Sequence, residues 1–70
     1  MNKTIEDLKR EYIAYQQEIG YEENAPWGVK PDMGRVQIFE GRAAEVVAKL
    51  QRAGFSGPVQ DERGVIYGRI

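Results

Sequence analysis

The sequence contains no cysteine and no histidine. Small domains often gain stability from disulfides or a structural zinc, and this chain lacks the thiol and imidazole groups on which those devices depend. Acid-base and nucleophilic chemistry would therefore fall to carboxylate, lysine, tyrosine, serine or threonine side chains, and none of these occurs in a spacing typical of a catalytic site. We expect a protein that is not an enzyme and that holds no cofactor or metal ion.

Long apolar runs and a strong charge of one sign are also missing. No run approaches the roughly 20 apolar residues that a membrane span needs, and the N-terminal segment MNKTIEDLKREY lacks the apolar core of a signal peptide. The formal net charge is −1, so no bulk positive field attracts nucleic acid or an anionic membrane. Together with the missing cysteines, these features predict a cytoplasmic protein without a membrane partner.

The 70 residues fit one small domain, 1–70, that opens with a helix over residues 4–19. Thr4 suits the N-cap and Asp7 the third helical position, while Gly20 suits the residue just past a helix end. Apolar residues recur at spacings of three and four, typical of one helix face. This stripe consists of Ile5, Leu8, Tyr12, Tyr15 and Ile19.

The middle of the chain changes its period twice. Residues 35–40, RVQIFE, alternate in the manner of a strand. Residues 42–53 then follow a helical period, and Gly54 with Phe55 is typical of a glycine helix ending in which Phe55 meets Leu50. Between the two predicted helices, residues 21–34 form a long loop stiffened by prolines.

Residues 58–70 are expected to form a hairpin, because Asp61 and Gly64 occupy the first and fourth positions of a type I turn followed by a glycine bulge. The predicted fold is therefore α+β: an N-terminal helix, a long loop and then a β-α-β-β unit. Its three-stranded sheet would be mainly antiparallel, with the last strand in the middle and both helices on one face.

The stretch RVQIFEGRAAEVVAKLQRAGF, followed by GVIYGRI, resembles half of a SPOR domain, the peptidoglycan-binding module. The repeated unit of that family is a strand, a helix ending in Ala-Gly-aromatic, and a second strand. The resemblance covers about half of the chain and implies a cell-wall or structural module. The N-terminal half departs from the family, since no strand precedes the first predicted helix.

The predicted loop and the end of the first helix carry the residues that we expect to bind a partner. The single tryptophan, Trp27, lies in this loop, where it either plugs the core or anchors a contact. Acidic residues gather around it, which suits a larger protein with a basic surface. The predicted partner-binding residues are Tyr21, Glu22, Glu23, Trp27 and Asp32.

Two other surfaces compete with this interpretation. An aromatic and basic sheet face would stack single-stranded nucleic acid, and its predicted residues are Arg35, Phe39, Tyr67 and Arg69. The apolar stripe of the first helix would alternatively serve as the seam of a homodimer, although packing on the chain's own sheet is the favoured interpretation.

The function predicted from these features is non-enzymatic protein binding. Small size, few catalytic groups and independence of cofactors suggest an accessory protein of a phage or mobile element that inhibits or adapts a larger host protein. The second hypothesis is a nucleic-acid-binding regulator, and the third is the cell-wall or structural module that the SPOR resemblance implies.

Overall fold

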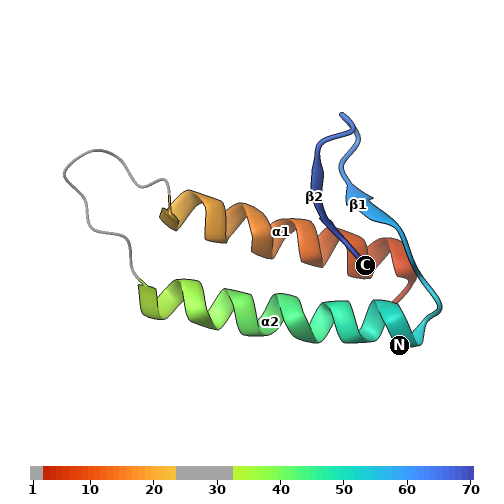
Figure 1. Cartoon of the computed structure of the whole chain (residues 1–70), viewed down its shortest axis with the longest axis horizontal. Helices are drawn as coiled ribbons and strands as arrows, with labels where there is room; N and C mark the ends of the chain where they lie inside the picture. Colours follow the sequence, from red (N-terminus) through yellow and green to blue (C-terminus); the bar gives the residue numbers. More distant parts are fainter. Residues whose placement is uncertain (1–2, 24–32) are drawn as a thin grey trace.

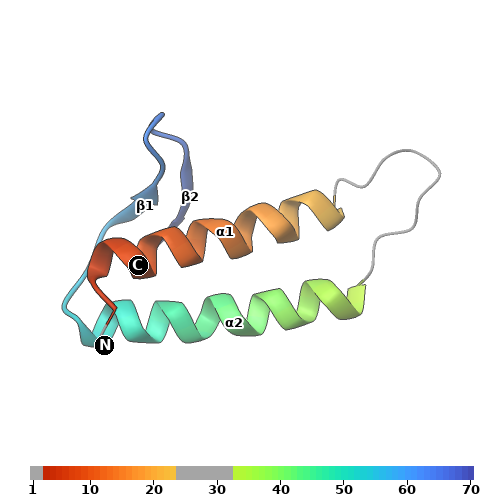
Figure 2. The same ribbon diagram turned by 180° about the vertical axis from the view of Figure 1, so that it is seen from behind.

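The computed structural model describes residues 3–23 and 33–70. Two helices come first, α1 (Ile5–Glu23) and α2 (Met33–Arg52), and two strands follow, β1 (Pro58–Gln60) and β2 (Ile66–Arg69). The helices lie side by side and run in opposite directions, and the strands form a hairpin beside the N-terminal half of α1 (Figures 1 and 2). The described part of the chain is thus a small α+β structure in which helices precede the sheet.

Helix α1 begins with the reciprocal cap that the sequence predicts. The backbone amide of Asp7 donates to the Thr4 hydroxyl at 3.1 Å, and the Thr4 amide donates to a carboxylate oxygen of Asp7 at 3.3 Å. The Thr4 amide, and after it the Thr4 hydroxyl, hold the pKa of the Asp7 carboxyl below its ordinary value. The predicted end of the helix was wrong, however. Gly20 lies inside α1, because another turn places Glu22 beside Arg35 of α2.

The predicted strand over residues 35–40 is wrong, because these residues lie in α2. RVQIFE alternates over six residues, but Val36 also stands seven residues before Ala43 and so continues the helical period of the following segment. Both side chains are buried in the helix. The glycine between them, Gly41, lies in the middle of α2. Packing against α1 therefore overrides the local strand pattern.

Two further expectations change with this helix. The sheet has two antiparallel strands, in the order β1-β2, so the three-stranded sheet and the β-α-β-β order were wrong. The long loop over residues 21–34 is shorter at both ends, since α1 continues to Glu23 and α2 begins at Met33. The rest of that loop, 24–32, lies outside the described residues. The first strand implied by the SPOR resemblance is likewise helical.

The end of α2 has the geometry that the sequence predicts. The amide of Phe55 donates to the carbonyl of Leu50 at 3.0 Å, and the amide of Gly54 donates to that of Gln51 at 3.1 Å. Gly54 has a φ of 86°, in the left-handed region that glycine adopts without strain. Phe55 packs against the cluster that contains Leu50, which closes this Schellman ending.

The C-terminal hairpin turns at Asp61. The carbonyl of Asp61 accepts from the amide of Gly64 at 3.0 Å, and its carboxylate accepts from the amides of Arg63 and Val65 at 2.9 and 3.0 Å. The register then shifts, because Val59 pairs with Gly68 whereas Gln60 pairs with Ile66. Tyr67 is therefore the extra residue of a β-bulge.

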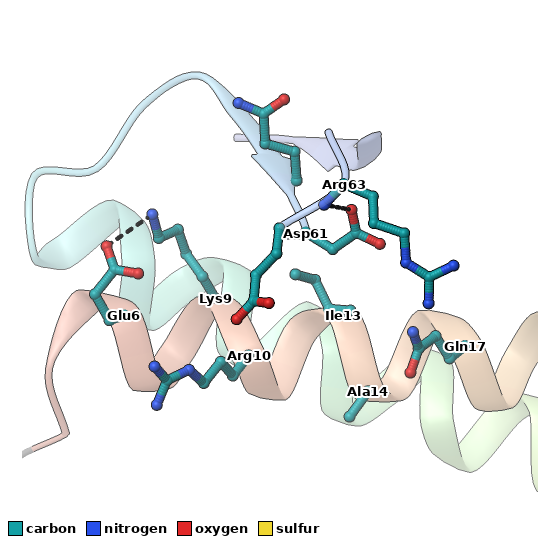
Figure 3. Close-up of a pocket in the computed structure, with 10 residues that line it drawn as sticks. Glu6, Lys9, Arg10, Ile13, Ala14, Gln17, Asp61 and Arg63 are labelled. Atoms are coloured by element: carbon teal, nitrogen blue, oxygen red, sulfur yellow. Dashed lines mark hydrogen bonds and ion pairs between the residues drawn. The ribbon is translucent and has the colours of Figure 1, made fainter. Parts of the chain in front are cut away.

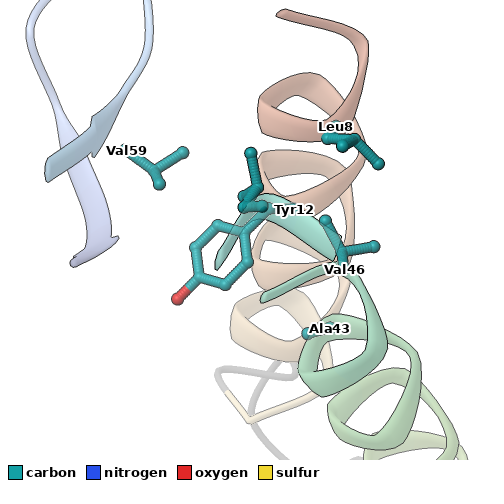
Figure 4. Close-up of a cluster of buried hydrophobic side chains, with 6 residues drawn as sticks. Leu8, Tyr12, Ala43, Val46 and Val59 are labelled. Carbon is teal, nitrogen blue, oxygen red and sulfur yellow. The ribbon is translucent and has the colours of Figure 1, made fainter. Parts of the chain in front are cut away.

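The core lies where both helices and the hairpin meet. Figure 4 shows Val59 pointing from the hairpin toward Tyr12, while Leu8 and Val46 lie in the seam between the helices. Val59 and Leu50 are both 0% exposed. Farther along the helix pair, Ile19 and Val36 are also buried. The six buried residues of the cluster are Leu8, Tyr12, Ala43, Val46, Leu50 and Val59.

Tyr12 packs directly on the backbone of the hairpin at Gly68. A β-carbon placed on Gly68 would overlap the Tyr12 hydroxyl and would lie 2.7 Å from Cζ and 2.9 Å from Cε1. Real β-carbons do not approach other atoms so closely, and the ring has no space to retreat because Tyr12 is buried. Only glycine at position 68 leaves room for the hydroxyl end of the Tyr12 ring.

Replacing Gly68→Ala should therefore destabilise the protein by about 1–3 kcal/mol, the usual cost of overpacking. The matched control is Gly41→Ala in α2, where nothing lies within 4 Å of the added carbon. This control should stabilise the protein by about 1 kcal/mol, since alanine is the better helix former. Urea denaturation followed by circular dichroism measures both changes.

The contact also predicts a coupling between the two residues. Combining Gly68→Ala with Tyr12→Phe removes the overlapping hydroxyl, so the double variant should lose less stability than the two single changes add up to. Simple additivity would contradict the close contact between the ring and Gly68.

Candidate functional site

The predicted partner-binding residues separate into two groups. Tyr21 lies on α1 with 72% of its surface exposed. Glu22 is different, since its side chain is only 17% exposed and one carboxylate oxygen lies 3.9 Å from Nε of Arg35. Glu23 is the last residue of α1. Trp27 and Asp32 lie outside the described residues, so the structure brings together only part of this predicted site.

The four residues of the predicted nucleic-acid face do not share a sheet. Arg35 and Phe39 are one turn apart on α2, whereas Tyr67 and Arg69 lie on β2. The Arg35 guanidinium carbon lies 5.6 Å from the centre of the Phe39 ring. Phe39 also contacts Tyr15, with ring centres 6.1 Å apart. The contact with Tyr15 joins α2 to α1, and neither contact forms a stacking platform on the strands.

The apolar stripe of α1 packs within the chain. Leu8, Tyr12 and Ile19 are 5%, 8% and 6% exposed. Ile5 and Tyr15 are partly buried against the same cluster. The stripe predicted as an alternative dimer seam is therefore covered by α2 and the hairpin. The favoured expectation of a sheet beneath it was only partly met, because most of the covering comes from a helix.

A groove that the sequence did not predict lies between α1 and the turn of the hairpin (Figure 3). Its volume is about 480 Å³. Ile13 and Ala14 provide its apolar part, and the remaining lining residues are polar or charged. Those from α1 are Glu6, Lys9, Arg10 and Gln17, and those from the hairpin are Gln60, Asp61, Glu62 and Arg63.

The charges of this groove are balanced, and several are held by neighbours. Nζ of Lys9 lies 2.9 Å from Glu6 and 5.4 Å from the centre of the Phe55 ring. The hydroxyl of Tyr67 accepts from Gln17 at 3.1 Å and donates to Asp61 at 3.3 Å. Tyr67 is the bulged residue of β2, and its hydrogen bond with Gln17 joins the hairpin to α1. The groove offers polar contacts, but the balance of its charges selects no particular ion.

Asp61 is the most strongly held carboxylate of the groove. The amide of Val65 lowers its pKa, and the amide of Arg63 and the Tyr67 hydroxyl lower it further. Each of these donors stabilises the ionised form. The Asp61 carboxylate therefore serves as a hydrogen-bond acceptor that holds the turn. This role explains its position better than a role as a proton donor does.

Large apolar side chains reach solvent at two places in the described structure. Tyr21 and Met33 lie near the end of α1 and the start of α2, and Ile38 comes five residues after Met33 on α2. Val65 and Ile66 lie at the other place, on the hairpin. The exposed fractions are 72% for Tyr21, 54% for Met33, 57% for Ile38, 50% for Val65 and 62% for Ile66.

No three or more acidic side chains lie close enough together in residues 3–23 and 33–70 to hold a metal ion. Within the same residues, neither helix combines the length and the apolar character that crossing a membrane requires.

The pKa shift of Asp61 makes a prediction about acid. A carboxyl whose folded pKa is lowered stabilises the fold fully above its unfolded pKa, and it loses this effect as the pH falls through the folded pKa. Near neutral pH the wild type should therefore be more stable than Asp61→Asn, and the gap should close in acid. Denaturation across the pH range measures the gap.

The same prediction has a direct spectroscopic check. The carboxyl carbon of Asp61, followed by nuclear magnetic resonance, should titrate below the ordinary aspartate value of about 3.9. A midpoint at or above that value, or a stability gap independent of pH, would contradict the role of these three donors.

Comparison of the chain with protein-family models, with curated proteins and with solved structures finds no match, so the evidence on function comes from its own geometry.

Proposed function

We propose that this protein is a non-enzymatic protein-binding module that contacts a larger protein through the connected ends of α1 and α2. The observation that carries the proposal is the exposure of Tyr21, at 72%, and of Met33, at 54%. These two residues flank the segment 24–32, which contains Trp27. Tyrosine, tryptophan and methionine are enriched in protein interfaces, and tyrosine and tryptophan are frequent binding hot spots.

The antiparallel packing of the helices supports a single contact region at this end. Oε1 of Glu22 on α1 lies 3.9 Å from Nε of Arg35 on α2, so the end of α1 and the start of α2 are neighbours. Tyr21 directly precedes Glu22, and Met33 comes two residues before Arg35. Both exposed apolar side chains therefore belong to the same end of the molecule.

The charge of α1 indicates the kind of partner. Residues 5–23 contain six acidic and two basic side chains. Glu18 is exposed near Tyr21, while Arg35 lies beside Glu22. An acidic helix with an exposed aromatic residue suits a basic protein surface, because opposite charge speeds the encounter and the ring supplies buried area. We therefore propose that this protein is an accessory that inhibits or adapts such a partner.

Capture from a bacterial lysate, with and without nuclease, followed by affinity measurement with the purified partner tests this function. Tyr21→Ala and Met33→Ala should each weaken binding at least about tenfold, as truncation of an interface anchor does. The matched control is Val65→Ala on the hairpin, which is 50% exposed and distant along the chain. It should leave the affinity unchanged.

Two results would count against the proposal. Equal affinities for all three variants would show that the helix ends are not the binding site. Captured material that disappears on nuclease treatment would instead favour nucleic acid as the partner.

A further inference from the structure

One flank of the helix pair faces away from the hairpin. On α1, the hairpin side is identified by Ile13, which lines the groove against the hairpin turn, and by Gln17, which contacts Tyr67. Residues spaced by four, three and four lie along the other side of the buried stripe. This acidic row consists of Glu11, Tyr15, Glu18 and Glu22.

A basic row borders it on α2. Arg35 lies beside Glu22 and Phe39 contacts Tyr15, so this edge of α2 adjoins the acidic row of α1. Exposed residues continue along it at helical spacing and include one acid, Glu45, four residues before Lys49. The basic row consists of Arg35, Ile38, Arg42, Glu45 and Lys49, of which three are basic and one is acidic. We call the two rows together the helix-pair face.

The positions of the charges follow from the Glu22 and Arg35 contact. Because the helices are antiparallel, stepping four residues back from Glu22 and four forward from Arg35 brings Glu18 level with Phe39. Arg42 lies three residues beyond Phe39, between the levels of Glu18 and Glu11. Acidic side chains of α1 and basic side chains of α2 therefore occupy the same stretch of the helix-pair face. They lie at alternating levels along it, on opposite sides of its midline.

We propose that a second copy of this chain packs on the helix-pair face. A two-fold axis parallel to the helices places α1 of one copy over α2 of the other, as in a four-helix bundle. The acidic row of each copy then faces the basic row of its partner at two equivalent places. A perpendicular axis would place acid on acid, so the charges select one arrangement.

Apolar groups lie between the two rows. Ile38 is 57% exposed although it lies beside the partly buried ring of Phe39, and Tyr15 contacts that ring from α1. A second copy would cover these side chains, which form an apolar centre with a charged rim. Some charges already have neighbours in the chain, since Lys3 contacts Glu11 and Arg35 contacts Glu22. The second copy adds opposite charges to both rows.

This inference does not rest on the proposed function, because it uses the sides of the helices and not their connected ends. Sedimentation equilibrium of the whole chain tests it. The wild type should form a dimer that weakens as salt is added. Glu18→Lys and Arg42→Glu should each raise the dimer dissociation constant at least about tenfold, because each places like charges together at both contact sites.

Mixing the two variants separates association from a defect within one chain. In the mixed dimer, Lys at 18 faces Glu at 42, and the unchanged pair meets at the second site, so a heterodimer should form. Arg63→Glu on the hairpin turn is the matched control and should dimerise like the wild type. Circular dichroism confirms that each variant is folded.

Three outcomes would overturn the proposal. The first is a wild type that stays monomeric at all concentrations. The second is a dimer whose dissociation constant is changed by neither Glu18→Lys nor Arg42→Glu. A mixture that remains monomeric while both variants are folded would exclude the arrangement of α1 over α2.

Discussion

The structure depends on the meeting of Tyr12, Val59 and Gly68. A two-stranded hairpin is at best marginally stable in water, and helices in proteins take most of their stability from tertiary packing. Val59 brings the hairpin into the seam of the helices, and the Tyr12 ring lies against the strand where only glycine leaves room. One small cluster thus holds all of the described elements together, in a chain that has no disulfide to assist it.

Features decided by neighbouring residues were predictable from the sequence. The cap formed by Thr4 and Asp7, the ending at Gly54, and the turn from Asp61 to Gly64 each depend on hydrogen bonds that span five residues or fewer. Their residue types carry the physical cause, such as a short side chain that accepts from a free amide or a glycine that adopts a positive φ. No knowledge of the rest of the fold is needed for them.

Features decided by distant residues were not predictable. Residues 35–40 satisfy both a strand period and a helix period, and the choice depends on packing in the folded chain, where Val36 is buried. Gly20 suits a residue just past a helix end, but α1 continues through it, and α2 likewise continues through Gly41. The groove beside Asp61 joins residues such as Gln17 and Tyr67, which are 50 positions apart. The contact between Glu22 and Arg35 could be found only in the structure, because the two residues lie on different helices.

The ends of the hairpin ladder have a consequence for how this protein meets other chains. Pro58 on β1 has no amide hydrogen, and the bulge at Tyr67 breaks the regular spacing of amides and carbonyls along β2. An incoming strand needs an even row of such groups, so neither edge is a good template for sheet extension or amyloid-like stacking. Contacts with other molecules are thereby directed to side chains, and a short protein with exposed apolar residues is protected from aggregation through its own strands.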